Sequence, residues 1–180
     1  MPYTFALAGG CFWCLDAIYR EMRGVSEVTV GFAGGSVPHP TSEQVATGET
    51  GHAEVVRVSF DPAVVPPSVI LDIFFAFHDP TQLNRQGDDI GTHYRSALFY
   101  EDDEQRALFE RALAKAADLW EKPIVTRLER LDTFYPAEES NQAYFAKNPA
   151  DAYCERITKP KILRLRKSFA QYLVHSVGAG

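Results

Sequence analysis

The sequence predicts an α+β fold, on three observations about its 180 residues. Apolar residues alternate along some segments and recur at helical spacing along others. Over the first hundred residues these segments follow the order strand, helix, strand, strand, helix, strand. Long loops rich in Gly, Asp, His and Thr interrupt that order twice. This order is typical of a ferredoxin-like two-layer sandwich, in which helices cover an antiparallel or mixed sheet.

The first strand is expected at 3–8 and the first helix at 11–22. Gly24 supplies a stop, because glycine is common just past the end of a helix. The apolar residues of this helix recur at helical spacing: Leu15, Ile18, Tyr19 and Met22.

Strands at 25–33 and 53–60 follow, separated by a Gly- and Pro-rich loop at 34–51. A second helix begins near Pro66, since proline suits a helix start, and ends by His78. Its apolar side comprises Ile70, Ile73, Phe74 and Phe77.

A polar loop at 79–93 leads to a strand at 95–100. Acidic residues 101–104 then open a third helix, where negative charge suits the helix dipole. Its apolar stripe is Leu108, Ala112, Ala116 and Trp120. The expected additions to the sandwich are a strand at 124–131, a short helix at about 138–146 and an irregular C-terminal segment at about 147–180.

Charge and composition exclude several classes of protein. The 18 basic and 24 acidic residues give a net charge of −6, whereas general nucleic-acid binders are basic. No apolar run approaches the length of a membrane span, and the first ten residues lack the basic region of a signal peptide. Three cysteines are too few for a disulfide framework and suit a reducing compartment. We therefore expect one cytoplasmic, monomeric domain over 1–180 that binds neither nucleic acid nor membrane.

Cys11 is the strongest candidate for a reactive residue. It follows Gly9-Gly10 where the first strand turns into the first helix. Free backbone N–H groups and the helix dipole favour an anion at such a site, and they can lower the pKa of a thiol. Phe12 and Trp13 follow at once and provide an apolar wall, which suggests chemistry on a small apolar group.

Cys14 completes a Cys-x-x-Cys pair and has two interpretations. A dithiol oxidoreductase would use Cys11 and Cys14 together. Two bulky aromatic residues between the cysteines are unusual for that role, so a thiol packed in the helix is the favoured interpretation of Cys14. A metal site is not expected, because no second pair of ligands lies at a suitable spacing.

Glu54 is the candidate general acid. It follows Gly51-His52-Ala53 at the start of an alternating apolar strand, where burial would raise the pKa of its carboxyl. A solvated residue at a strand end is the alternative for Glu54. His52 is interpreted as a structural or hydrogen-bonding neighbour.

Two more segments carry polar candidates. Residues 85–96 gather charged and polar groups before a strand, and among them Tyr94 could donate a hydrogen bond to a substrate oxygen. Asp88 and Asp89 match no defined metal-binding loop. Cys154 lies in the irregular C-terminal region, where a mobile segment would suit a resolving cysteine, although a bystander thiol fits the spacing as well.

Together these motifs resemble the A-type peptide methionine sulfoxide reductases. The resemblance runs from about Leu7 to Cys154, and the motifs occur in family order. They are Gly-Cys-Phe-Trp at 10–13, Gly-His-Ala-Glu at 51–54, His-Asp-Pro at 78–80, Arg-Gln-Gly at 85–87, Gly-Thr-x-Tyr-Arg-Ser at 91–96, and Asn-Pro at 148–149 with Tyr-Cys at 153–154.

The resemblance implies a thiol-dependent reduction of free and protein-bound methionine-S-sulfoxide, a repair reaction. No cofactor would be bound, and thioredoxin or another thiol would regenerate the enzyme. The implied catalytic roles are nucleophile for Cys11, acid for Glu54, hydrogen-bond donor for Tyr94, organiser of the polar side for Asp89, and resolving thiol for Cys154. The implied substrate-binding residues are Phe12, Trp13, Ser42 and His52.

The chain departs from the family pattern at three places. Ser42 stands where many members have a tyrosine that binds the sulfoxide oxygen, so either a water bridges to the serine or Tyr94 acts alone. Cys14 stands where many have glycine, and it could form an alternative disulfide with Cys11 or Cys154 or simply pack. No cysteine follows Cys154, so the C-terminal two-step disulfide relay of some members cannot operate. Dithiol exchange through Cys11 and Cys14 and a non-enzymatic peptide-binding domain are the competing functions.

Overall fold

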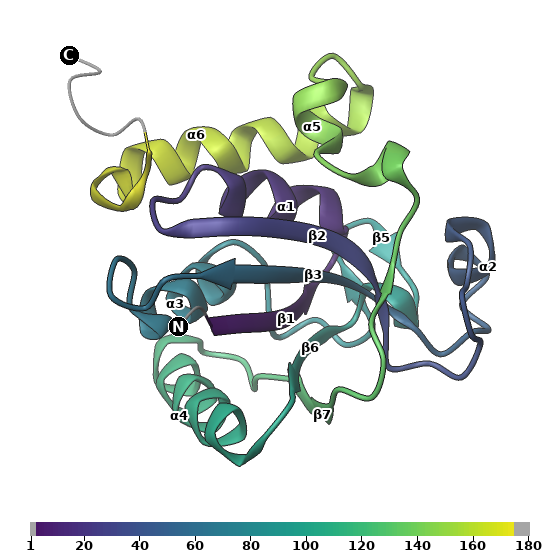
Figure 1. Ribbon diagram of the computed structural model, residues 1–180, viewed down its shortest axis with the longest axis horizontal. Coiled ribbons are helices and arrows are strands. Elements are labelled where there is room, and N and C mark those ends of the chain that lie inside the picture. Colours follow the sequence, from purple (N-terminus) through teal and green to yellow (C-terminus); the bar gives the residue numbers. More distant parts are fainter. Residues whose placement is uncertain (1–2, 175–180) are drawn as a thin grey trace.

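A six-stranded sheet forms the centre of the molecule in the computed structural model, which describes residues 3–174 (Figure 1). The prediction of an α+β fold is confirmed. The strand order is β7-β6-β1-β3-β2-β8. The strands are β1 Tyr3–Gly9, β2 Val25–Ala33, β3 Ala53–Phe60, β6 Ser96–Tyr100, β7 Arg127–Arg130 and β8 Tyr135–Pro136.

The four central strands pair antiparallel throughout. β1 lies between β3 and β6, with Phe5 opposite Val58 and Leu7 opposite Leu98. β2 pairs with the other edge of β3 and places Phe32 opposite Glu54. The edge strand β7 differs, because it runs parallel to β6.

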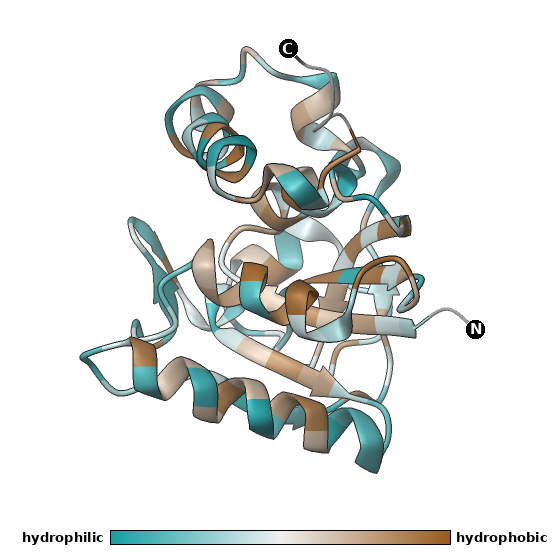
Figure 2. Cartoon of the chain, turned by 90° about the vertical axis from the view of Figure 1, so that its left-hand side faces the viewer, coloured by the Kyte–Doolittle hydropathy of each residue, from teal (hydrophilic) through white to brown (hydrophobic). Residues whose placement is uncertain are grey.

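The two faces of the sheet carry side chains of different size. On one face, large residues such as Phe5 and Leu7 join a core with helices α1, Phe12–Arg20, and α3, Pro67–Ala76. The long helix α4, Asp103–Leu119, buries Phe109 in that core, and Figure 2 shows hydrophobic and hydrophilic bands alternating along it. The opposite face is lined largely by alanines, against which Leu131 and Phe134 pack.

The two long loops contain short elements that the sequence analysis did not predict. The loop at 34–51 holds the helix α2, Ser42–Ala46, which begins with a capping box between Thr41 and Gln44. The loop at 79–93 holds a hairpin of β4, Arg85–Gln86, and β5, Asp89–Ile90, followed by a 3₁₀ turn at Thr92–Tyr94.

The helix expected at about 138–146 is divided. A 3₁₀ turn at Glu139–Asn141 and the short helix α5, Tyr144–Lys147, lie on either side of Ala143. Ala143 has a φ of 51°, in the left-handed region, and this conformation ends the first turn before the second begins.

The expectation of an irregular C-terminal segment is wrong for most of its described part. A π-helical turn at Cys154–Thr158 continues into α6, Lys159–Ser168, and a 3₁₀ turn follows at Ala170–Tyr172. The helix lies along α1, where it buries Ile162 and Leu165 (Figure 1). These two apolar positions stand among basic residues, which concealed the helical pattern in the sequence. The rest of the segment, 175–180, lies outside the described residues.

Within residues 3–174, no helix combines the length and the apolar character that a membrane crossing requires.

Substitution of Leu165 by alanine should test whether α6 stabilises the fold. The Leu165 side chain is fully buried, so Leu165→Ala should lower the free energy of unfolding by about 2–5 kcal/mol in urea titrations. Leu163→Ala is the matched control, because Leu163 is 54% exposed on the same helix and its loss should cost no more than about 0.5 kcal/mol. Equal losses from the two variants would contradict a packed α6.

Candidate functional site

Cys11 lies directly before the first residue of α1, in an extended conformation. The turn from β1 into α1 depends on Gly10, which has a φ of 88° and packs so closely that a Cβ atom there would lie 2.8 Å from Gln86 Cβ. Cys11 is partly exposed, whereas Cys14 and Cys154 are buried. The backbone N–H of Trp13 donates a hydrogen bond to the Cys11 sulfur and acts to lower the pKa of the thiol.

Glu54 lies beside Cys11 and caps the same helix. Its Oε1 accepts a hydrogen bond of 3.1 Å from the N–H of Phe12, the first residue of α1. This N–H has no partner inside the helix, so the carboxyl satisfies it. The sequence order alone could not place Glu54 here, because the contact joins residues 42 positions apart.

Burial raises the pKa of Glu54 to about 8. The Phe12 N–H opposes this shift, while the negative charge of Asp89 adds to it. Glu54 is therefore largely protonated at neutral pH, and it can both accept the Phe12 hydrogen bond and donate its own proton.

The expectation that the helix start lowers the pKa of Cys11 is wrong for this structure. Burial raises that pKa well above its usual value, and the charges of Glu54 and Cys14 raise it further. The Trp13 N–H favours the thiolate but does not outweigh them. At neutral pH the site therefore holds a protonated thiol beside a protonated carboxyl.

Tyr94 and Asp89 come from the segment after β4. Burial raises the pKa of Tyr94, and so do the charges of Glu54 and Cys11, so its hydroxyl remains a donor. Asp89 accepts a hydrogen bond of 2.7 Å from the hydroxyl of Tyr153. In the sequence Tyr153 stands out only as part of the Tyr-Cys motif, and its position next to Cys154 is the signal that points to it.

An aromatic wall stands next to Cys11. The Trp13 ring stacks on Tyr144 with centroids 3.7 Å apart and meets the edge of Tyr153 at 5.8 Å. The Trp13 Nε1–H donates to Asn141 Oδ1 at 3.0 Å. Phe12 turns the other way, into the core, where its ring lies 5.6 Å from that of Phe32. The sequence analysis did not identify Asn141 or Tyr144, which lie far from Trp13 along the chain.

Ser42 is connected to this wall. Its hydroxyl donates to Glu138 Oε2 at 2.6 Å and accepts from Asn141 Nδ2 at 3.0 Å. Asn141 in turn holds Trp13, so the bonds of Ser42 lead to the indole. The described contacts of Ser42 include none with Cys11, Glu54 or Tyr94.

His52 supports a loop. Its Nε2–H donates to Val37 O at 2.7 Å, and its Nδ1 accepts from the Gly35 N–H at 3.0 Å. Both ring nitrogens are thus engaged by the backbone, and the ring is buried. His52 holds the loop that follows β2 rather than facing Cys11.

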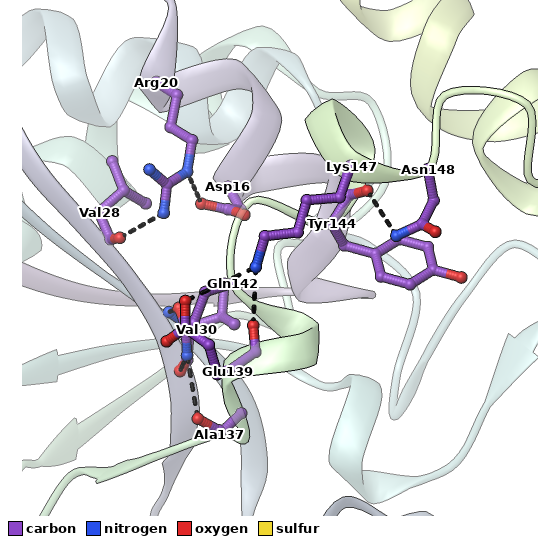
Figure 3. A network of polar contacts seen from close by, with 10 residues as sticks. All are labelled: Asp16, Arg20, Val28, Val30, Ala137, Glu139, Gln142, Tyr144, Lys147 and Asn148. Atoms are coloured by element: carbon purple, nitrogen blue, oxygen red, sulfur yellow. Dashed lines mark hydrogen bonds and ion pairs between the residues drawn. The ribbon is translucent and has the colours of Figure 1, made fainter.

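The segment that carries Asn141 and Tyr144 is attached to β2 by Gln142. The amide of Gln142 bonds both the N–H and the carbonyl of Val30, each at 2.9 Å, in the manner of a neighbouring strand (Figure 3). Nearby, Arg20 links the buried Asp16 of α1 to the carbonyl of Val28. These bonds hold the aromatic wall against the start of α1.

The two buried cysteines meet at Thr158. The Cys14 sulfur lies 3.3 Å from Thr158 Oγ1, and Thr158 also forms a hydrogen bond with Cys154 that acts to lower the pKa of that thiol. Burial nevertheless raises the pKa of Cys154. The three cysteines are free thiols. The structure thus places Cys154 near Cys14, with Thr158 in contact with both.

A cavity of about 180 Å³ opens beside Cys11. Gln86, Asp89 and Tyr153 line it, and Arg156 and Lys161 add positive charge. Within residues 3–174, no three or more His, Cys, Asp or Glu side chains gather as a metal site would require.

The raised pKa of Glu54 should make stability depend on pH. An unfolded glutamate has a pKa of about 4.3, so between that pH and about 8 the folded protein holds a proton that the unfolded chain releases. The free energy of unfolding should therefore fall as the pH rises through this range. Glu54→Gln removes the titration and keeps an acceptor for Phe12, so urea titrations from about pH 5 to 8 should show the wild type losing stability relative to the variant. If the free energies of unfolding of the wild type and Glu54→Gln changed with pH in parallel, the raised pKa of Glu54 would be contradicted.

The comparisons with known proteins agree on one family. The family model described as peptide methionine sulfoxide reductase matches residues 3–173. The chain is 54% identical over 170 residues to peptide methionine sulfoxide reductase MsrA of Clavibacter michiganensis subsp. michiganensis, covering 94% of this chain and 97% of the relative.

Solved structures are similar as well. Mxr1 of Saccharomyces cerevisiae in reduced form superposes with a TM-score of 0.80 at 35% identity, covering 85% of this chain and 89% of the other. Mxr1 in complex with Trx2 gives a TM-score of 0.57 at 26% identity, covering 79% and 84%. The chain therefore belongs to the peptide methionine sulfoxide reductase family, whose members are oxidoreductases.

Proposed function

We propose that this chain reduces the S epimer of methionine sulfoxide, free or in proteins, by attack of the Cys11 sulfur. The observation that carries the proposal is the hydrogen bond from the Phe12 N–H to Glu54, which holds beside Cys11 a carboxyl that burial keeps protonated. A sulfoxide is a poor electrophile until its oxygen is protonated or strongly hydrogen-bonded. A nucleophile and an acid are thus positioned together.

The reaction balances with these two groups. Glu54 protonates the sulfoxide oxygen while the Cys11 sulfur bonds to the substrate sulfur and its thiol proton restores the Glu54 carboxyl. The hydroxyl then passes from the substrate sulfur to the Cys11 sulfur as the bond between the two sulfurs breaks, which leaves a sulfenic acid on Cys11 and releases methionine as the reduced product. Two electrons pass from the thiol to the sulfoxide.

The other site residues have supporting roles in this proposal. Tyr94 donates a hydrogen bond to the sulfoxide oxygen, and Asp89 orients Tyr153 on the polar side. Trp13 lies against the S-methyl group, while Phe12 fixes the start of the helix from the core. Ser42 acts on Trp13 through Asn141, and His52 holds the preceding loop.

Regeneration would consume a thiol and no bound cofactor. Cys154 resolves the oxidised enzyme as an intramolecular disulfide, and thioredoxin or another dithiol then reduces it. The structure of the related Mxr1 in complex with Trx2 supports thioredoxin as the partner. The family match does not favour simple dithiol exchange through Cys11 and Cys14. Cytoplasmic location, a monomeric state and a single domain stay predictions.

A chiral assay tests the proposal. The reduced protein, incubated with racemic methionine sulfoxide peptide and dithiothreitol, should consume the S epimer and leave the R epimer, as resolved by chiral chromatography. Cys11→Ser should show no consumption, because a hydroxyl is a far weaker nucleophile than a thiol. A urea titration of the variant controls for folding. Loss of both epimers, or residual reduction by Cys11→Ser, would overturn the assignment.

A further inference from the structure

The structure places Cys14 between the start of α1 and the segment that carries Cys154, because its sulfur contacts Thr158. Cys11 precedes α1 and Cys14 is its third residue, and the Cys14 N–H donates to the Cys11 carbonyl at 3.2 Å. One helical turn separates them, the spacing at which Cys-x-x-Cys pairs at helix starts form disulfides. The two residues therefore have the spacing that a disulfide between them requires.

The segment that carries Cys154 contacts Cys14 through Thr158. Thr158 lies one turn beyond Cys154, and its hydroxyl contacts the Cys14 sulfur at 3.3 Å. Cys14 therefore lies one helical turn from Cys11 and in contact, through Thr158, with the turn that carries Cys154.

Several contacts hold the residues around Cys154. Tyr153 precedes Cys154, and its hydroxyl bonds Asp89 while its ring packs on Trp13. The Cys154 N–H donates to Asp151 Oδ1 at 3.3 Å, and the turn then continues into α6. These contacts hold the turn in the position in which Thr158 meets Cys14.

We propose that Cys14 relays oxidation from Cys11 to Cys154. This inference rests on the proposed function, which supplies the sulfenic acid on Cys11. The Cys14 sulfur attacks the Cys11 sulfur, the S–O bond breaks, and water leaves with the thiol proton of Cys14. Cys154 then attacks the Cys14 sulfur, so that a Cys14–Cys154 disulfide forms and Cys11 is released as a thiol.

The second step, the attack of Cys154 on Cys14, would take place at the π-helical turn that carries Cys154. Cys154 is the first residue of that turn, and π turns are rare and frequently mark functional sites. Adjustment of this turn would bring Cys154 onto Cys14 while α6 stays packed on α1. After the second step Cys11 is free for another substrate, and the oxidised pair lies away from the sulfoxide site.

Rapid-quench disulfide mapping tests the relay. The reduced enzyme is mixed with one equivalent of methionine sulfoxide, quenched in acid with N-ethylmaleimide, and digested. Trypsin leaves Cys11 and Cys14 together on the peptide that ends at Arg20, and it leaves Cys154 on the peptide 148–156. Chymotrypsin then cleaves after Phe12 and Trp13, which separates Cys11 from Cys14. The Cys11–Cys14 disulfide should appear first and decline as Cys14–Cys154 forms.

Two variants isolate the steps. Cys154→Ser should stop at Cys11–Cys14 after releasing one methionine per enzyme. Cys14→Ser, which keeps a hydrogen-bonding partner for Thr158, should also release one methionine but retain a Cys11 sulfenic acid that dimedone traps. Its thioredoxin-driven turnover should fall at least about tenfold.

Other outcomes would overturn the relay. A Cys11–Cys154 disulfide as the first bond in the wild type would do so, and so would unchanged turnover of Cys14→Ser. If Cys14→Ser does not fold, the order of disulfides in the wild type still decides. Failure of the proposed function is distinct, because then the wild type would release no methionine and would form no sulfenic acid.

Discussion

The hydrogen bond from the Phe12 N–H to Glu54 is the contact on which the site depends. It joins the start of α1 to the start of β3, and it sets a partly buried carboxyl next to Cys11. The helix start favours a negative charge at this point, whereas burial disfavours one. Burial prevails, and Glu54 keeps its proton to about pH 8. The same desolvation raises the pKa of Cys11, so both groups enter the reaction protonated.

The rest of the structure keeps that contact in place and closes it off. Antiparallel pairing of β1 with β3 sets Cys11 and Glu54 at adjoining strand ends. Gln142 ties the segment after β8 to β2, so that Asn141 and Tyr144 hold Trp13 over the helix start. The turn at Cys154–Thr158 then meets Cys14 through Thr158, and the thiols of Cys14 and Cys154 are both buried. Contacts between distant segments thus position both the Glu54 carboxyl and the thiols.

Local features were predictable from sequence and long-range ones were not. Periodicity located the main strands and helices, and it put Cys11 at the start of the first helix, where the structure has it directly before α1. Nothing local says that Glu54 meets Phe12, or that Tyr144 stacks on Trp13, because each contact depends on packing between distant segments. The pKa of Cys11 was misjudged in direction for the same reason, since burial cannot be read from a helix start. The helix α6 was missed because its two buried residues stand among charged ones.

The protonation state of Glu54 is the most direct test of this account. The protein can be labelled with ¹³C at the glutamate carboxyl carbons, and the Glu54 resonance assigned by its loss in Glu54→Gln. Titration by NMR should give a midpoint near pH 8 for this one carboxyl. A midpoint near the ordinary glutamate value of about 4.3 would mean that Glu54 is ionised at neutral pH. It would then lack a proton to give the sulfoxide, and the proposed chemistry would be contradicted.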